Sequence, residues 1–450
     1  MNNKKAVIYR TKKDSDERIA KIGEKGFVTP DKITSSRLIT VFPELEYQTV
    51  LGFGGAFTEA ASTTYDCLDK DEKEKVIKAY FDKEEGIGYN FCRTHIHSCD
   101  FTPEPYTYIK DGDETLESFD MSHDEKSLIP MIKDAKKCAD FKLFASPWTP
   151  PAFMKEEKTL NFGPSLLPEY YDLWAEYIKK YILKMRDYGI DICGITVQNE
   201  PRARQKWESC YYSPEQERDF VKNSLGKALD GLGVKIFIWD HNKDGIVERA
   251  EDILSDKDAE KYIDGVAFHW YTGDHFENIE LFSKMYPDKM IFCSEICKAS
   301  EEKGVKVKDG WKFAESYGHE IIGDFNSGCC AFCDWNMILN ENNGPYHWRP
   351  EVRSCDAPVI INTKTKEVTF EPSYYYIGHF SKFVQSGAKR LAVSKWHPLI
   401  EACAFKNPDG SIAVIVMNKS DEDFIGNLRM NRQNLEYECD RHSILTFVIK

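Results

Sequence analysis

The stretch Gly194-Ile195-Thr196-Val197-Gln198-Asn199-Glu200-Pro201 has the pattern of a short buried strand that ends at a carboxylate. Its central isoleucine, threonine and valine are β-branched, as strand residues often are. Pro201 has no amide hydrogen to donate to a sheet, so the strand ends there. We therefore expect Glu200, with Asn199 beside it, at the carboxyl end of a strand.

A second stretch, Lys289-Met290-Ile291-Phe292-Cys293-Ser294-Glu295, follows the same plan and also places one glutamate at the end of an apolar run. Parallel strands present their carboxyl ends at the same edge of a sheet, so Glu200 and Glu295 are expected to face each other across a cleft. We interpret the rest of the chain as the scaffold that holds these two carboxylates in register.

From Val50 onward, strand-like runs alternate with amphipathic helical stretches, which is typical of βα repeats around a parallel sheet. Eight strands are predicted, and eight βα units close naturally into a (β/α)8 barrel. The segment Tyr374–Phe383 is predicted as the last barrel helix. The predicted barrel strands are Gly52–Phe57, Tyr89–His95, Phe141–Ser146, Gly194–Gln198, Lys235–Asp240, Gly265–His269, Met290–Ser294 and Gly328–Trp335.

Both ends of the chain have the pattern of short strands instead. We therefore predict an α/β protein with a (β/α)8 TIM barrel over residues 46–385 and an accessory β-sandwich formed by residues 1–45 and 386–450. Asn407-Pro408-Asp409-Gly410 has the composition of a hairpin turn in this sandwich. The strands predicted for the sandwich are Ala6–Arg10, Ser36–Phe42, Arg390–Val393, Leu399–Phe405, Ser411–Asn418 and Ser443–Ile449.

Composition limits the partners of the chain. Its 450 residues carry a net charge of −14, which repels the phosphate backbone of nucleic acids. No run approaches the ~20 apolar residues of a membrane span, and the N-terminal segment lacks the apolar core of an export signal. We therefore expect no nucleic acid partner, no membrane insertion, and a cytoplasmic protein whose fourteen cysteines are free thiols.

In barrels of this kind, the chemistry takes place at the carboxyl ends of the strands. The residues expected there are carboxylates, hydrogen-bonding groups and indoles, with no glycine-rich phosphate cradle, and we expect no cofactor. They are Glu59, Arg93, Asp100, Phe101, Trp148, Asn199, Glu200, Asp240, His241, His269, Tyr271, Glu295, Asp334, Trp335 and Asn336.

Two glutamates at facing strand ends suit the cleavage of a glycosidic bond, in which one carboxyl group protonates the leaving oxygen and the other attacks the anomeric carbon or activates water. Either glutamate alone could be a solvated loop residue. The rigid segment Ser146–Pro151 is expected to hold Trp148 at the rim of the site, where it and Trp335 offer flat indole surfaces to a sugar. We therefore favour a glycoside hydrolase.

Two alternatives from other classes stay open. His95-Ile96-His97 is an HxH motif at a strand end, and further histidines lie at the ends of the fifth and sixth strands, a set similar to the ligands of metal-dependent amidohydrolases. Those barrels carry the motif on their first strand rather than the second, and we expect no metal. A barrel that binds sugar without cleaving it is the other alternative, but it has no need of two facing glutamates.

The strand ends and their flanking segments resemble glycoside hydrolase family 30, the family of acid β-glucosidase (glucosylceramidase). The resemblance extends over most of the chain and rests on many short segments rather than on a single motif. The matching segments are Gly52–Ala60, Ser98–Phe101, Tyr106–Tyr108, Ala145–Trp148, Asn199–Pro201, Tyr212–Phe220, His269–Tyr271, Ser294–Glu295, Asp334–Asn336 and Gly378–Phe383.

This resemblance implies retaining hydrolysis of β-linked sugars, with Glu200 as acid/base and Glu295 as nucleophile. Such an enzyme needs its two carboxyl groups ~5–5.5 Å apart and a protonated acid, so we expect a raised pKa for Glu200. The residues implied to bind substrate are Asp100, Phe101, Trp148, Asn199, Tyr271 and Trp335, and those implied to support the nucleophile are Arg93, His269 and Asn336.

The expected location narrows the substrate class. A cytoplasmic enzyme meets small glycosides rather than polymers or membrane sphingolipids, so we expect an exo-acting β-glucosidase that acts on short substrates. β-1,6-Glucanase, β-xylosidase and β-fucosidase activities occur in the same family and are the alternatives. Contacts to the leaving group are expected from the loops Arg202–Cys210 and Asn340–Asp356.

Overall fold

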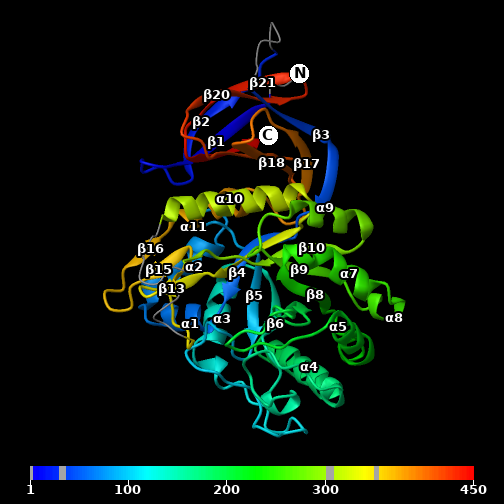
Figure 1. The fold of residues 1–450 in the computed structure, drawn as a ribbon. Coiled ribbons are helices and arrows are strands. Elements are labelled where there is room, and N and C mark those ends of the chain that lie inside the picture. The colour runs from blue at the N-terminus through cyan, green and yellow to red at the C-terminus, as the bar shows by residue number, and fades with distance from the viewer. Residues whose placement is uncertain (1–3, 30–36, 301–308, 349–353) are drawn as a thin grey trace.

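The structure is a computed structural model that describes residues 4–29, 37–300, 309–348 and 354–450, and it confirms the predicted barrel (Figure 1). Eight parallel strands close into a ring, with β10 and β12 adjacent. All eight predicted strands are present, and β7 lies two residues earlier than predicted. In ring order, the strands are β4 Gly52–Phe57, β5 Phe91–Ile96, β6 Lys142–Pro147, β7 Ile192–Thr196, β8 Lys235–Asn242, β9 Gly265–His269, β10 Met290–Glu295 and β12 Ala331–Asn336.

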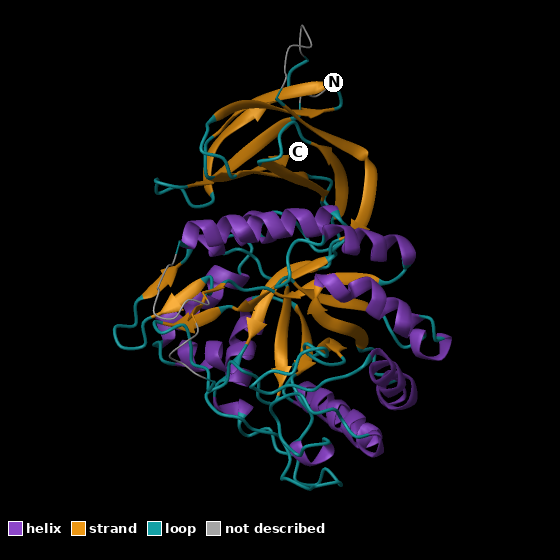
Figure 2. Cartoon of the chain, in the orientation of Figure 1, coloured by secondary structure: helices purple, strands orange, loops and turns teal. Residues whose placement is uncertain are grey.

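Helices form an outer layer around these strands (Figure 2). In α4, bulky apolar residues recur every three or four positions, so one face of the helix is buried. No helix in the described part of the chain combines the length and the apolar content needed to cross a bilayer. The helices are α1 Glu59–Asp66, α2 Lys70–Phe81, α3 Leu128–Cys138, α4 Tyr171–Asp187, α5 Pro214–Phe220, α6 Gly226–Leu229, α7 Ile246–Leu254, α8 Lys257–Glu260, α9 Phe276–Met285, α10 Gly310–Asn326 and α11 Pro372–Ser381.

Both chain ends form one nine-stranded sheet next to the barrel, as predicted for the β-sandwich (Figure 1). The first strand pairs with the last, and Ala6 lies opposite Ile449. A bridge between Val28 and Asn434 links the two edges of the sheet, which therefore folds over on an apolar core. In sheet order, the strands are β2 Ala20–Gly26, β1 Lys5–Lys12, β22 Ser443–Ile449, β19 Ile412–Asn418, β18 Ile400–Lys406, β17 Lys389–Ser394, β3 Leu38–Thr49, β20 Phe424–Met430 and β21 Gln433–Cys439.

Strand β3 runs from the sheet toward the barrel. It corresponds to the predicted strand Ser36–Phe42, except that Ser36 lies outside the described residues. The domain boundary predicted between residues 45 and 46 falls inside β3. Five short strands lie in the connections that follow β10 and β12. They are β11 Ala299–Ser300, β13 Ile338–Asn340, β14 Ser354–Cys355, β15 Val359–Ile361 and β16 Val368–Phe370.

Helix α10 lies between the barrel and the sheet (Figure 1) and carries His319 at their contact. The Nδ1 atom of His319 lies 2.9 Å from Oε1 of Glu401 in β18, and its Nε2 atom lies 3.2 Å from Oδ2 of Asp274. The hydrogen bond to Glu401 raises the pKa of His319 above its usual value, although burial acts in the opposite direction. A charged imidazolium therefore links the two domains.

We expect this link to make the stability of the protein depend on pH. A histidine whose pKa is raised on folding stabilises the fold fully below its unfolded pKa of ~6.5 and loses that contribution as the pH rises through the folded value. The variant His319→Gln should therefore lower the free energy of unfolding by about 1 kcal/mol at pH 5.5 and by less at pH 8.5. Thermal unfolding of both proteins measures this difference, and an equal loss at both pH values would show that folding does not raise the pKa of His319.

Candidate active site

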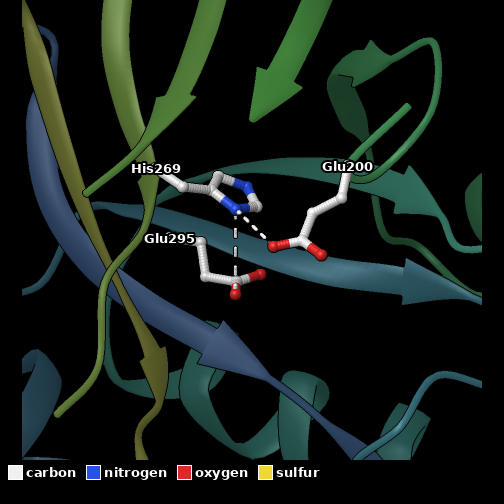
Figure 3. A group of neighbouring side chains, drawn as sticks. All are labelled: Glu200, His269 and Glu295. Atoms are coloured by element: carbon white, nitrogen blue, oxygen red, sulfur yellow. Dashed lines mark ion pairs between the residues drawn. The ribbon is translucent and has the colours of Figure 1, made fainter. Parts of the chain in front are cut away.

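The carboxyl ends of β7, β9 and β10 bring Glu200, His269 and Glu295 together (Figure 3). One oxygen of each glutamate and one nitrogen of His269 all lie within 4.8 Å of one another. This separation suits the ~5–5.5 Å of retaining glycosidases and is shorter than the ~6.5–9.5 Å that leaves room for a water molecule in inverting enzymes. The geometry therefore favours direct attack of one carboxylate on a sugar.

Glu200 is held through both its backbone and its side chain. Its φ is 49°, in the left-handed region, and its amide donates a hydrogen bond to the Asp240 carbonyl at 3.0 Å. The Nε2 atom of Gln205 donates to Oε2 of Glu200 at 3.1 Å. Gln205 lies in the loop Arg202–Cys210, where contacts to the leaving group are expected, but the sequence does not single out Gln205 itself.

Glu295 receives two hydrogen bonds from predicted partners. The Arg93 guanidinium donates to Oε2 at 2.7 Å, and the Tyr271 hydroxyl donates to Oε1 at 2.9 Å. Arg93 is completely buried, so solvent screens its charge only weakly. A cation and a hydroxyl donor together stabilise negative charge on the Glu295 carboxylate.

Asp240, at the end of β8, organises the groups around this pair. Its Oδ2 atom accepts hydrogen bonds from Arg93 at 2.8 Å and from Thr196 at 2.6 Å. Its Oδ1 atom accepts from Ser294 at 2.5 Å and contacts Nε2 of His269 at 3.0 Å. Burial alone would raise the pKa of Asp240, but the charge of Arg93 and the contact with His269 hold that pKa well below its usual value. The sequence places Asp240 at a strand end but gives it no role.

His269 lies between carboxylates and carries a positive charge. Its Nε2 atom lies 3.0 Å from Oδ1 of Asp240, and its Nδ1 atom lies 3.5 Å from Oε1 of Glu200 and 3.9 Å from Oε1 of Glu295. Burial would lower the pKa of His269, but the charge of Glu295 and the contacts with Asp240 and Glu200 raise it to about 9.

The expectation of a raised pKa for Glu200 is therefore wrong. Burial does raise the pKa of this carboxyl group, but His269, His241 and Gln205 outweigh burial and lower the pKa to about 2. The prediction starts from the need for a protonated acid and does not include a charged imidazole next to it. One proton therefore resides on His269, 3.5 Å from Glu200.

Aromatic side chains form a wall next to Arg93. Trp148, after β6, and Trp335, in β12, stack with ring centroids 5.1 Å apart, and Phe101 meets Trp335 edge-on at 5.9 Å. The Arg93 guanidinium lies 4.9 Å from the Trp148 ring and 5.4 Å from the Trp335 ring. Both indoles are only 2% exposed, so the expected position of Trp148 at the rim is wrong. Its ring is packed into the wall.

The remaining predicted residues surround these groups. Oδ1 of Asn199 accepts a hydrogen bond from Arg93 at 2.9 Å, which fixes the orientation of its amide. Oδ1 of Asn336, at the end of β12, accepts from the Thr58 hydroxyl at 2.7 Å. Asp100 lies in the connection after β5 and is 7% exposed, and the adjacent Phe101 joins it to the aromatic wall.

The two histidines of the HxH motif form hydrogen bonds with other residues inside the protein. Nδ1 of His97 meets the Tyr177 hydroxyl at 2.8 Å, and Nε2 of His95 accepts from the amide of Glu59 at 3.0 Å. Both rings are completely buried. Across the described residues, one group of histidine, cysteine or acidic side chains lies close enough to share a metal ion: Glu200, His269 and Glu295 (Figure 3). This group does not include the HxH histidines that the amidohydrolase alternative requires.

Comparison with known proteins places the chain in a family. Residues 50–384 match the glycosyl hydrolase family 30 TIM-barrel domain, and residues 387–447 match the β-sandwich domain of that family. The chain is 33% identical to lysosomal acid glucosylceramidase of Mus musculus over 88% of this chain and 80% of that protein. Among solved structures, it is similar to SrfJ from Salmonella typhimurium (34% identity, TM-score 0.93) and to the endo-β1,6-glucanase BT3312 (27% identity, TM-score 0.87), each over 99% of both chains. The chain therefore belongs to glycosyl hydrolase family 30 and is a glycoside hydrolase.

Proposed function

We propose that the chain is a retaining β-glycosidase in which Glu295 is the nucleophile and Glu200 is the acid/base. The observation that carries this proposal is the short separation, within 4.8 Å, between oxygens of the two carboxylates. In the first step, a Glu295 oxygen bonds to the anomeric carbon while the glycosidic bond breaks, and the leaving oxygen takes a proton. In the second step, Glu200 takes a proton from water, and the water oxygen displaces Glu295.

The proton for the first step resides on His269 before substrate binds. Its Nδ1 atom lies 3.5 Å from Oε1 of Glu200. A bound sugar excludes water from the site, and the loss of water raises the free energy of the charged His269 imidazolium and Glu200 carboxylate. Transfer of the proton to Glu200 neutralises both groups and is therefore favoured. Glu200 then passes it to the leaving oxygen and is ionised again for its role as a base.

We further propose that the enzyme is an exo-acting β-glucosidase for short β-glucosides. The similarity to mouse glucosylceramidase supports a glucose-binding site. The stacked rings of Trp148 and Trp335 give the proposed sugar site an aromatic wall next to Arg93. An endo-β-1,6-glucanase is the second candidate, and the similarity to BT3312 favours it.

Hydrolysis of nitrophenyl β-glucoside, β-xyloside, β-fucoside and β-galactoside, compared with β-1,6-linked gluco-oligosaccharides, tests this proposal. We expect cleavage of the β-glucoside and release of glucose alone from the oligosaccharides. Longer first products would favour the glucanase. The first-formed sugar should be the β-anomer by NMR, and an α-anomer would contradict retention. Activity should survive EDTA, and a loss that zinc restores would contradict the carboxylate mechanism.

Asp100→Ala should lower kcat/KM by on the order of 100-fold, because a carboxylate that accepts hydrogen bonds from two sugar hydroxyls contributes to transition-state binding. Steady-state kinetics on the nitrophenyl β-glucoside measures the loss. Asp111→Ala is the control, since Asp111 is exposed in the same connection between β5 and α3 and should be silent. Near wild-type kinetics for Asp100→Ala would mean that the sugar binds elsewhere.

A further inference from the structure

A buried ion pair joins three of the loops around the site. Glu208, between β7 and α5, is completely buried, and its Oε1 atom accepts a hydrogen bond from the Ser98 hydroxyl at 2.7 Å. Its Oε2 atom lies 3.0 Å from Nε2 of His347, in the connection after β12. The other nitrogen of His347, Nδ1, lies 3.0 Å from the carbonyl oxygen of Thr102. The pair therefore ties together the loops that follow β5, β7 and β12.

These contacts give His347 a positive charge. The Thr102 carbonyl can only accept, so the Nδ1 atom that faces it carries a hydrogen. The Nε2 atom lies 3.0 Å from the Glu208 carboxylate, and a nearby cation stabilises a buried carboxylate. Burial lowers the pKa of His347, but Glu208 outweighs burial and raises it. Burial raises the pKa of Glu208, but His347 outweighs burial and lowers it.

The contact of Glu208 with Ser98 and the contact of His347 with Thr102 lie on either side of Asp100 and Phe101, which are predicted to bind the sugar. Ser98 precedes Asp100, and Thr102 follows Phe101. Phe101 in turn packs against Trp335 in the aromatic wall. A shift of either loop would therefore displace Asp100 and one side of the wall together.

We propose that Glu208 and His347 are positioning residues, a charged clasp that holds Asp100 and Phe101 in place for sugar binding. This inference rests on the proposed function, since it assigns the clasp to the sugar site proposed there. When His347 loses a proton, one of its nitrogens presents a lone pair to an acceptor, and the clasp loosens. Sugar affinity therefore falls as the pH rises through the pKa of His347, while the chemistry of bound substrate is unchanged.

Other ionisable groups face the pair from neighbouring elements. Asp100 adds negative charge next to His347 and favours the imidazolium. Near Glu208, burial lowers the pKa of His97 to about 3 and raises that of Cys99 well above its usual value, so both are neutral near pH 7. Burial also lowers the pKa of Lys155, on the β6–α4 connection, to about 8. The charge of Glu208 raises the pKa of Lys155, so the titration of Lys155 changes in Glu208→Gln. Glu208 stays in place in His347→Gln, so the comparison of that variant with the wild type isolates His347.

The variants Glu208→Gln and His347→Gln test the clasp, since each removes a charge and keeps a side chain that can form hydrogen bonds. In the wild type, KM for the nitrophenyl glycoside that it cleaves should rise between pH 5.5 and pH 8.5. At pH 5.5, each variant should have a KM about 10-fold higher than the wild type. This KM should no longer rise with pH as it does in the wild type, and kcat should stay within about 3-fold of the wild-type value. Glu315→Gln is the matched control, because it neutralises a similar contact, 2.7 Å from Oε1 of Glu315 to Nδ1 of His442, away from the site.

Wild-type KM values with wild-type pH dependence in both variants would overturn the proposal, and so would a loss confined to kcat. An NMR titration of His347 needs no substrate and separates this inference from the proposed function. The pKa of His347 should be above 6.5 in the wild type and should fall in Glu208→Gln, and an unchanged pKa would contradict the clasp. If no glycoside is cleaved, the proposed function fails, and calorimetric binding of a glucose-shaped iminosugar at the two pH values replaces KM.

Discussion

Glu295→Gln should lower kcat by on the order of 10⁵-fold on every substrate, the scale seen when a covalent nucleophile is removed. An amide is neutral and cannot form the glycosyl intermediate. In the wild type, Arg93 and Tyr271 donate to Oε2 and Oε1 of Glu295 at 2.7 and 2.9 Å. The amide retains the size of the side chain; its oxygen can accept from Arg93, and its NH2 group can donate to the Tyr271 hydroxyl oxygen. Substrate binding should therefore survive, and the loss should appear in kcat rather than KM.

The measurement is steady-state hydrolysis of aryl glucosides with and without azide. Azide should not restore a β-configured product, because the group that inverts the anomeric carbon in the first step is missing. Glu315→Gln is the control for glutamate replacement, since Glu315 in α10 contacts Nδ1 of His442 at 2.7 Å, away from the site. Activity of Glu295→Gln within about 10-fold of the wild type would assign the nucleophile to another residue.

Glu200→Ala should have a different signature, because its effect depends on the leaving group. General acid catalysis contributes about 10²–10⁴-fold, so alkyl glucosides should lose that factor in kcat/KM. Dinitrophenyl glucoside needs little protonation to depart, and its first step should be nearly unaffected. The second step lacks its base, so the glycosyl intermediate should accumulate, and azide should accelerate turnover and yield the β-glycosyl azide.

The pH profile gives an independent readout for the same residue. The first step needs the proton shared by His269 and Glu200, so kcat/KM on alkyl glucosides should have a final decline as the pH rises through about 9, the pKa of His269. The decline of kcat/KM at high pH should be absent when Glu200→Ala hydrolyses dinitrophenyl glucoside. If Glu295→Gln, rather than Glu200→Ala, showed the leaving-group dependence and the rescue by azide, Glu295 would be the acid/base and Glu200 the nucleophile.

The barrel can be predicted from the sequence because its signals are local. Each barrel strand is a short apolar run that ends at polar residues, and the rule that barrel chemistry lies at carboxyl strand ends then collects Glu200 and Glu295. The turn Asn407–Gly410 is confirmed for the same reason: Gly410 has a φ of 84°, and the Asn407 amide donates to the Ser411 carbonyl at 2.8 Å.

The features that escape prediction depend on contacts between distant segments. Strands β2 and β21 carry many charged and polar side chains, so their sequences resemble loops. The prediction also lacks β20, in which buried residues alternate with more exposed ones. The positive charge of His269 and the low pKa of Glu200 depend on how β7, β8 and β9 bring Glu200, Asp240 and His269 together. No local pattern connects Glu208 with His347, because that contact exists only once two connections meet.

The order of strands in the sandwich sheet has a consequence for synthesis of the chain. Strands β3 and β17 are neighbours in the sheet, although the whole barrel lies between them in the sequence. Hydrogen bonds of 2.8 Å from Val50 to Ala388 and from Gly387 to Val50 join the segments where the chain enters and leaves the barrel. At about 5–20 residues per second on the ribosome, β3 therefore waits roughly 20–70 s for its partner β17.

During that interval, β1, β2 and β3 lack most of the sheet that later covers them. Strand β1 meets its partner β22 only after the remaining sandwich strands have been made. Unpaired strand edges invite pairing with other chains, and charged side chains oppose it. Lys21, Glu24 and Lys25 are exposed along β2, and their charges oppose pairing of this strand with other chains while the barrel folds.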